Sequence, residues 1–220
     1  MQWTVGIIQK ASPLPISVDS SNADILRAGL AACDRSRGYP MLNSVSLERA
    51  GAVPIATEFH AVVIASAAGE KDLPATVPGK MTNIERIVSM LTGAGIPLGA
   101  IHVDPLVFPI STDSQNGRIF LDAVAAVRQK FGPGIHVVAG LSNVSFGMPA
   151  RRLLNLVFAS LAVEAGADGG IVDPLQVNSR AMQGLDRKSG QYALARALLL
   201  GEDEFGMNYI AAFRDGQLSE

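Results

Sequence analysis

The stretch Gly140-Leu141-Ser142-Asn143-Val144-Ser145 follows the apolar run of residues 135–139 and precedes a helical pattern that starts near Pro149. An apolar run that ends in small and polar residues is typical of a buried strand that continues into a loop. In α/β proteins, ligands bind beyond the carboxyl ends of parallel strands. The position of Asn143 therefore predicts that its amide contacts a ligand.

The same order of apolar run, polar residue and helical pattern recurs along the chain. We expect strands at residues 15–18, 41–42, 61–65, 100–103, 135–139 and 170–172. Strands that alternate with helices predict a parallel sheet with right-handed crossovers. The sequence therefore predicts an α/β fold of the (β/α)8 TIM-barrel type, incomplete with about six β/α units, since a complete barrel takes about 250 residues.

Composition limits the classes of partner that the chain can have. Of its 220 residues 48% are apolar and 17% are charged, and the formal net charge is −2. No basic patch favours nucleic acid or a membrane surface, and no apolar stretch is long enough to span a bilayer. We therefore expect a cytoplasmic protein that binds neither. A single cysteine and three scattered histidines give no local metal-ligand pattern.

Helix starts can be predicted from capping residues. Ser21 with Asp24 and Thr82 with Glu85 each have the spacing of a capping box, so we expect helices to begin there. On that interpretation the segment 67–82, which includes Lys80, is a solvated loop. Near residue 151 we expect two arginines in the first turn of a helix, with their guanidinium groups in water.

Polar residues follow the predicted strands. Asp19, Asn43 and Asp104 offer two carboxylates and one amide, a set that can read a flat heterocycle with several N–H donors. The alternative is that such residues only cap helices or form turns. Three of them at strand ends make the two interpretations about equal, whereas for Asp173 before Pro174 we favour a turn. His102 we expect to be an interior histidine.

Four segments carry a resemblance to a known family. They are Val18-Asp19-Ser20-Ser21-Asn22, Leu42-Asn43-Ser44, His102-Val103-Asp104-Pro105-Leu106 and the opening stretch at residues 140–145. Their order and spacing resemble those of the pterin-binding methyltransferases, above all the methyltetrahydrofolate:corrinoid iron–sulfur protein methyltransferases and the folate domain of cobalamin-dependent methionine synthase. The resemblance extends over nearly all of the chain.

The resemblance implies a function and a set of site residues. It implies a barrel that binds methyltetrahydrofolate and passes the N5 methyl group to the cobalt of a separate corrinoid protein. Asp19, Asn43 and Asp104 match the residues that hydrogen-bond the pterin ring, and Asn143 matches the asparagine that contacts N5. The Asn143 amide does not titrate in the accessible range, so its catalytic role would be hydrogen bonding rather than proton transfer.

The resemblance also sets an expectation for the domain. The first two strands of the family's barrel would lie before Met1, so we expect residues 1–220 to be a single pterin-binding barrel domain that lacks them. Exposed sheet edges are usually covered by association, which predicts a homo-oligomer.

Two alternatives remain open at this point. Dihydropteroate synthase shares the barrel, but its Ser-Arg-Lys-like and Arg-x-His-like segments are replaced here by residues 141–144 and 172–174. The other alternative is a non-catalytic pterin-binding or interaction protein.

Overall fold

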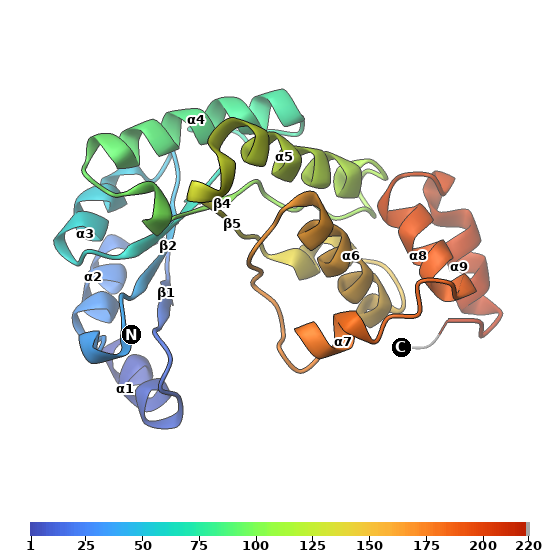
Figure 1. The fold of residues 1–220 in the computed structure, drawn as a ribbon, viewed down its shortest axis with the longest axis horizontal. Helices are drawn as coiled ribbons and strands as arrows, with labels where there is room; N and C mark the ends of the chain where they lie inside the picture. The colour runs from blue at the N-terminus through green and yellow to red at the C-terminus, as the bar shows by residue number, and fades with distance from the viewer. Residues whose placement is uncertain (219–220) are drawn as a thin grey trace. The chain divides into compact units, whose positions relative to one another are not determined.

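A computed structural model describes residues 1–218, in which strands and helices alternate along the chain (Figure 1). The strands are β1 (Ser17–Asp19), β2 (Met41–Val45), β3 (Val62–Ser66), β4 (Ile101–Asp104) and β5 (His136–Val137). The helices are α1 (Gln2–Ala11), α2 (Ala23–Ala31), α3 (Val53–Glu58), α4 (Val77–Gly93), α5 (Asn116–Phe131), α6 (Arg151–Ala165), α7 (Ser179–Gln183), α8 (Gly190–Leu199) and α9 (Met207–Arg214). No helix within residues 1–218 is both long enough and apolar enough to cross a membrane.

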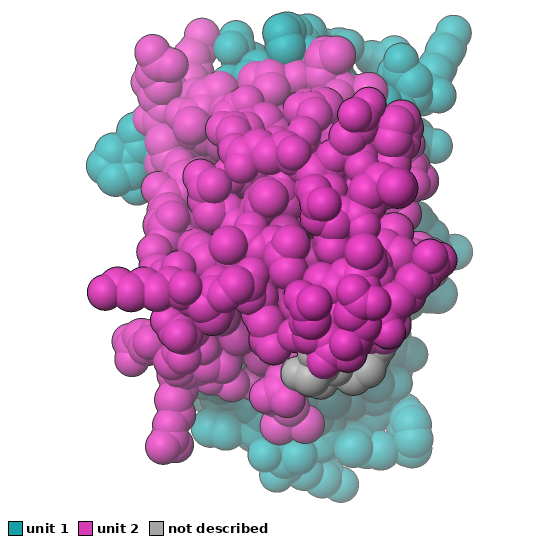
Figure 2. Space-filling view, turned by 90° about the vertical axis from the view of Figure 1, so that its right-hand side faces the viewer, with its two compact units in different colours: residues 1–74, 78–104, 131–136 teal, residues 75–77, 105–130, 137–220 magenta. Residues whose placement is uncertain are grey.

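The chain divides into two compact units, which Figure 2 colours separately. Residues 1–74, 78–104 and 131–136 make up the first, which we call the N-terminal unit. Residues 75–77 and 105–130, together with the chain from residue 137 onward, make up the second, the C-terminal unit. Each unit is described by itself below.

The sheet is parallel, with its strands in the order β1-β2-β3-β4-β5. Neighbouring strands are therefore consecutive in sequence, as expected when each crossover helix returns the chain to the next position. Val18, Leu42 and Val63 are at most 1% exposed and lie in the core of the N-terminal unit. Figure 1 shows α2 and α3 on the same side of β1 and β2. The first four predicted strands are thus confirmed to within two or three residues.

The predicted strand at residues 170–172 is wrong. Only one isolated bridge forms there, between Ile171 and Gly140, supported by a 2.9 Å hydrogen bond from the Ile171 N–H to the carbonyl of Ala139. Gly169 and Gly170 precede this bridge and Pro174 follows it, and both residue types weaken strand pairing. The fifth strand is also shorter than residues 135–139, since β5 contains two residues.

Both predicted capping boxes are wrong as well. The cap of α2 is Asn22, whose side-chain oxygen accepts hydrogen bonds from the N–H groups of Asp24 and Ile25 at 2.9 and 3.1 Å. Thr82 lies inside α4 and donates to the carbonyl of Pro78 at 2.9 Å. A proline in the first turn suits a helix start, so α4 begins five residues before Thr82.

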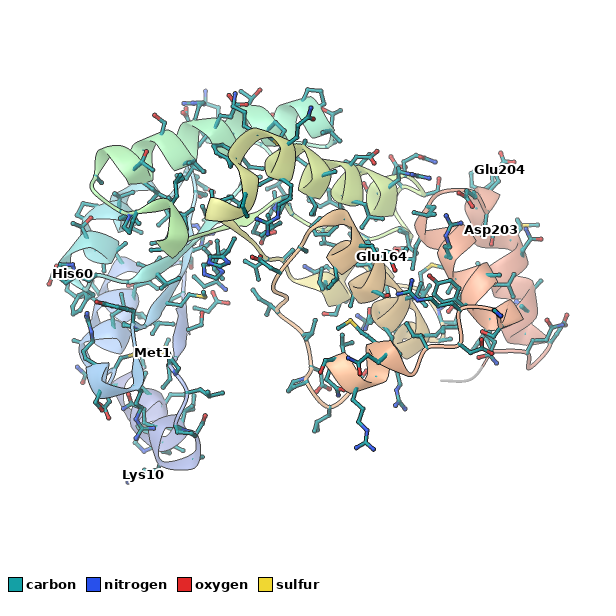
Figure 3. The ribbon with its side chains drawn as sticks, in the orientation of Figure 1. Met1, Lys10, His60, Glu164, Asp203 and Glu204 are labelled. Carbon is teal, nitrogen blue, oxygen red and sulfur yellow. The ribbon has the colours of Figure 1, made fainter. Side chains whose placement is uncertain are left out.

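The start of α9 depends on one buried carboxylate, that of Asp203, which is labelled in Figure 3. Asp203 is 2% exposed, and its two oxygens accept from the N–H groups of Asn208 and Tyr209 at 3.0 and 2.9 Å. Satisfying these N–H groups compensates for burying the charge.

Gly117 on α5 provides a test of packing in the C-terminal unit. A Cβ at Gly117 would overlap the backbone carbonyl oxygen of Leu199 at the end of α8, and backbone cannot move aside cheaply. We expect Gly117→Ala to lower the free energy of unfolding by about 1–3 kcal/mol, measured by urea denaturation. Gly93→Ala is the matched control, because nothing lies within 4 Å of a Cβ added there. Equal stability of the two variants would contradict the proposed packing.

Candidate functional site

Asp19, the last residue of β1, lies beside Asn43, which is the third of the five residues of β2 and not the residue after a strand that was expected. The two residues are in register across the parallel pair. The side-chain nitrogen of Asn43 donates to Asp19 Oδ2 at 3.1 Å, and the N–H of Ser20 donates to the Asn43 carbonyl at 3.2 Å. Asp19 is exposed and Asn43 is half-buried, so their polar atoms are open to a ligand at this edge.

Asp104 ends β4 at the same edge of the sheet. It is in register with Ser66, the last residue of β3. The loop that leaves β3 is tied to it, because the N–H of Ala67 donates to the Asp104 carbonyl at 2.9 Å. Asn83 of α4 in turn donates its side-chain N–H to the Ala67 carbonyl at 2.9 Å. These bonds fix the first turns of α4 relative to Asp104.

Lys80 is a functional candidate whose burial the sequence analysis did not predict. It lies one turn before Asn83 on α4 and is 1% exposed, so the predicted solvated loop is wrong for this residue. Burial lowers the pKa of Lys80 from 10.5 to about 8, and the negative charge of Asp104 opposes part of that shift. The signal was present in the sequence, because Lys80 has helical spacing to the buried residues Ile84, Ile87 and Leu91.

Two histidines stack in the N-terminal unit. The rings of His102 on β4 and His136 on β5 have centroids 4.4 Å apart and planes inclined by 19°. Both are half-buried, and His102 lies two residues before Asp104, on the same face of β4. We expected His102 to be an interior histidine. It is half-buried, so that expectation is met in part, and its neighbour is the imidazole ring of His136.

Asn143 lies in a short 3₁₀ turn, Leu141–Ser145, that follows β5. Other parts of the C-terminal unit fix this turn. The N–H of Ile110 donates to the Val144 carbonyl at 3.0 Å, and the Ser111 hydroxyl donates to the Phe146 carbonyl at 2.7 Å. The turn is thereby anchored to the segment that follows β4 in the chain.

The side chain of Asn143 is exposed, while Leu141, Val144 and Ser145 beside it are buried. Its amide makes no side-chain hydrogen bond within residues 1–218. A Cβ at Gly140 would come within 3.1 Å of the Asn143 amide nitrogen, so glycine leaves room for that amide. The turn thus presents a hydrogen-bonding group on a buried, rigid base.

Arg151 is held by this turn rather than free in water as expected. Its Nη2 donates to the Ser142 carbonyl at 3.1 Å, and its Nε donates to the Ser145 hydroxyl at 3.0 Å. Its guanidinium also lies 5.6 Å from the ring centre of Phe146.

The turn expected at Asp173 is confirmed, since the Asp173 Oδ1 accepts from the N–H of Leu175 at 2.9 Å.

The structure brings some of the predicted site residues together. Asp19, Asn43 and Asp104 share one edge of the sheet in the N-terminal unit. Asn143 belongs to the C-terminal unit. Asp19, Asn43 and Asp104 together provide two carboxylates and one amide. Asn143 provides a separate amide, which can both donate and accept a hydrogen bond.

Comparison with known proteins identifies relatives of this chain. A family model described as pterin binding enzyme matches residues 1–173. The methylcorrinoid:tetrahydrofolate methyltransferase of Eubacterium limosum is 30% identical over 223 residues, a match that covers 99% of this chain and 77% of that relative. The methionine synthase of Mycobacterium tuberculosis is 33% identical over 176 residues, which is 74% of this chain and 14% of methionine synthase.

Solved structures show the same fold. Dihydropteroate synthase from Xanthomonas albilineans, in complex with 7,8-dihydropteroate, matches with a TM-score of 0.64 at 19% identity, covering 83% of this chain and 72% of that one. Dihydropteroate synthase from Coxiella burnetii matches with a TM-score of 0.62 at 18% identity, covering 90% and 72%. At these identities the likeness concerns the fold alone, and it confirms the incomplete α/β barrel type that the sequence predicts.

The burial of Lys80 predicts a pH dependence of stability. Between pH 8 and 10.5 the unfolded chain holds a proton at Lys80 that the folded chain has lost. The free energy of unfolding of the wild type, relative to that of Lys80→Met, should therefore rise with pH in this window, by up to about 1.4 kcal/mol per pH unit. Urea denaturation of both proteins at several pH values measures the difference, and parallel pH profiles would contradict the assignment. Lys10→Met, on the exposed part of α1, controls for the loss of one positive charge.

Proposed function

This chain belongs to the pterin binding enzyme family, and from that premise we propose that it transfers a methyl group between N5 of methyltetrahydrofolate and the cobalt of a corrinoid protein. The observation that carries the proposal is the set Asp19, Asn43 and Asp104 in the N-terminal unit, and we assign Asn143 a role from the resemblance of its segment to that of the pterin-binding methyltransferases. All four lie within the residues that the family model matches. The methyltransferase relatives support the reaction class.

Recognition of the pterin ring follows from the donors and acceptors at the sheet edge. The pyrimidine half of a reduced pterin presents ring N–H and amino donors, which ionised carboxylates accept. Asp19 and Asp104 supply such acceptors, while the amide of Asn43 can both donate and accept.

Asn143 has a different part in the proposal. A tertiary amine is a poor leaving group until its nitrogen accepts a proton or a strong hydrogen bond. An amide N–H directed at N5 therefore stabilises the transition state more than the ground state, because charge changes at N5 as the N–CH₃ bond breaks. The corrinoid of the partner protein supplies the nucleophile that takes the methyl group. This chain then needs no serine, cysteine or histidine nucleophile.

The direction of transfer is a separate matter. The name of the Eubacterium limosum relative describes transfer between methylcorrinoid and tetrahydrofolate. The same residues serve N5 whether the methyl group leaves or arrives, because both directions pass through one transition state. We propose methyltetrahydrofolate as the donor for this chain, within one pterin-binding domain that spans residues 1–220.

The role of Asn143 is tested by Asn143→Ala. We expect this variant to bind methyltetrahydrofolate, measured by calorimetry, but to transfer the methyl group to a corrinoid protein about 10²–10³-fold more slowly. Gln183→Ala, which removes an exposed side-chain amide from α7, is the matched control and should transfer at the wild-type rate.

Three outcomes separate the hypotheses. Failure of the wild type to bind methyltetrahydrofolate would refute the proposed function. If Asn143→Ala transfers the methyl group at the wild-type rate, the proposed pterin site stands but Asn143 has no role in the mechanism. Binding without transfer in the wild type, given a competent corrinoid acceptor, would select the non-catalytic pterin-binding alternative.

The role of Asp104 is tested by Asp104→Asn, which keeps the shape of the side chain and removes its charge. We expect the dissociation constant for methyltetrahydrofolate to rise about 10- to 100-fold, since hydrogen bonds to charged groups contribute about 1.5–3 kcal/mol. Calorimetry measures the constant, and circular dichroism checks that the variant is folded. An unchanged affinity in a folded variant would exclude Asp104 from the pterin site.

A further inference from the structure

A pocket lies in the N-terminal unit at the amino ends of β2, β3 and β4. Its volume is about 450 Å³, which lies within the range of small-molecule sites. Its lining includes Tyr39, which precedes β2, Val62, which begins β3, and Ala100, which precedes β4. All of its lining residues belong to the N-terminal unit.

The pocket is separate from the proposed pterin site. Asp104 ends β4 and is in register with Ser66, the last residue of β3. Val62 and Ser66 are the first and last residues of β3, a separation of about 13 Å at the rise of an extended strand. A small ligand held at the amino ends of these strands therefore does not reach Asp104.

The pocket combines a buried apolar base with exposed aromatic and basic side chains. Ala56, Ala61 and Ile96 in its lining are at most 6% exposed. Tyr39 is 62% exposed, and His60 is also exposed. An apolar base with a few polar groups beside it is typical of a site for a small molecule.

Arg35 gives the pocket its charge. Its guanidinium lies 5.2 Å from the centre of the Tyr39 ring, and one of its nitrogens donates to the Phe59 carbonyl. A guanidinium has five N–H donors, so this bond leaves others for a ligand. No carboxylate pairs with Arg35 within residues 1–218, and neither aspartate nor glutamate lines the pocket. The formal charge of the lining is therefore +1, which favours an anion.

His60, which is labelled in Figure 3, occupies a backbone position that usually belongs to glycine. Its φ of +45° lies in the left-handed region. The end of α3 requires this conformation, because the N–H of His60 donates to the Thr57 carbonyl at 3.1 Å and the N–H of Ala61 donates to the Ala56 carbonyl at 2.9 Å. A histidine here costs stability relative to glycine. Backbone strain of this kind is found at ligand sites.

We infer that this pocket binds a small planar aromatic anion, at a site distinct from that of the pterin. The exposed ring of Tyr39 offers a surface on which an aromatic ligand can stack. Arg35 beside it offers N–H donors in the planar geometry that a carboxylate accepts. His60 adds an imidazole at the same pocket. The inference does not rest on the proposed function, because none of these residues belongs to the proposed pterin site.

The experiment uses indole-3-acetate as the probe and the uncharged indole-3-acetamide as its matched control, both measured by calorimetry at low ionic strength. We expect the wild type to bind indole-3-acetate with a dissociation constant of about 1 mM or lower, as for a ligand of this size. The amide should bind up to about fivefold more weakly, the range for an exposed ion pair. Excess methyltetrahydrofolate should leave binding of indole-3-acetate unchanged.

Two variants separate the charged and the aromatic contacts. Arg35→Gln should bring the affinity ratio of the two probes close to one, whereas Lys10→Gln, which removes an exposed positive charge from α1 in the same unit, should keep the wild-type ratio. Tyr39→Ala should weaken both probes about two- to tenfold. Trp3→Ala, which removes a 79% exposed ring from α1, is its matched control and should bind both probes as the wild type does.

His60→Gly distinguishes a ligand contact from a structural role. We expect it to raise the urea concentration at the midpoint of unfolding, because glycine relieves the left-handed conformation. It should at the same time weaken binding of indole-3-acetate about two- to fivefold. A histidine with a structural role alone would change the midpoint and leave the affinity as it is in the wild type.

The inference is overturned if indole-3-acetate does not bind the wild type, or if Arg35→Gln and Tyr39→Ala bind it as the wild type does. Displacement of indole-3-acetate by methyltetrahydrofolate would also overturn it, because the probe would then occupy the pterin site. If indole-3-acetate binds as expected and methyltetrahydrofolate does not bind at all, the proposed function fails while this inference stands.

Discussion

The in-register pairing of parallel strands is the constraint on which the candidate site depends. Asp19 pairs with Asn43, and Ser66 pairs with Asp104, so the polar residues emerge at one edge of the sheet. A slip of one residue in either pair would turn these side chains to the opposite face. Buried neighbours such as Val18 and Leu42 prevent that slip, because it would also move their apolar side chains into water.

The connection from β3 to α4 adds a second constraint. Ala67 bonds both to Asp104 and to Asn83, and α4 then buries Lys80 within reach of the charge on Asp104. Burying an ammonium group lowers the stability of the fold near neutral pH. In our account this loss is tolerated because the buried ammonium group places a positive charge near Asp104, which we propose as a ligand-binding residue.

The sequence allowed prediction of polar residues that end clear apolar strands. Prediction failed in segments whose local pattern fits more than one structure. Asp19 and Asp104 follow clear apolar runs and end β1 and β4, so their positions were predictable. Asn43 was expected after a strand at residues 41–42, but it lies inside β2, which continues to Val45. Lys80 was not recognised, because the capping-box spacing of Thr82 and Glu85 hid a helix that begins earlier. The strand expected at residues 170–172 is limited to one bridge, since flanking glycines weaken pairing more than an apolar run of two residues can offset.

The most direct test of the central claim is a crystal structure of the protein with methyltetrahydrofolate bound. Our account predicts that the pyrimidine edge of the ring hydrogen-bonds Asn43 in β2 and Asp104 at the carboxyl end of β4. A ring that contacts neither residue would contradict it.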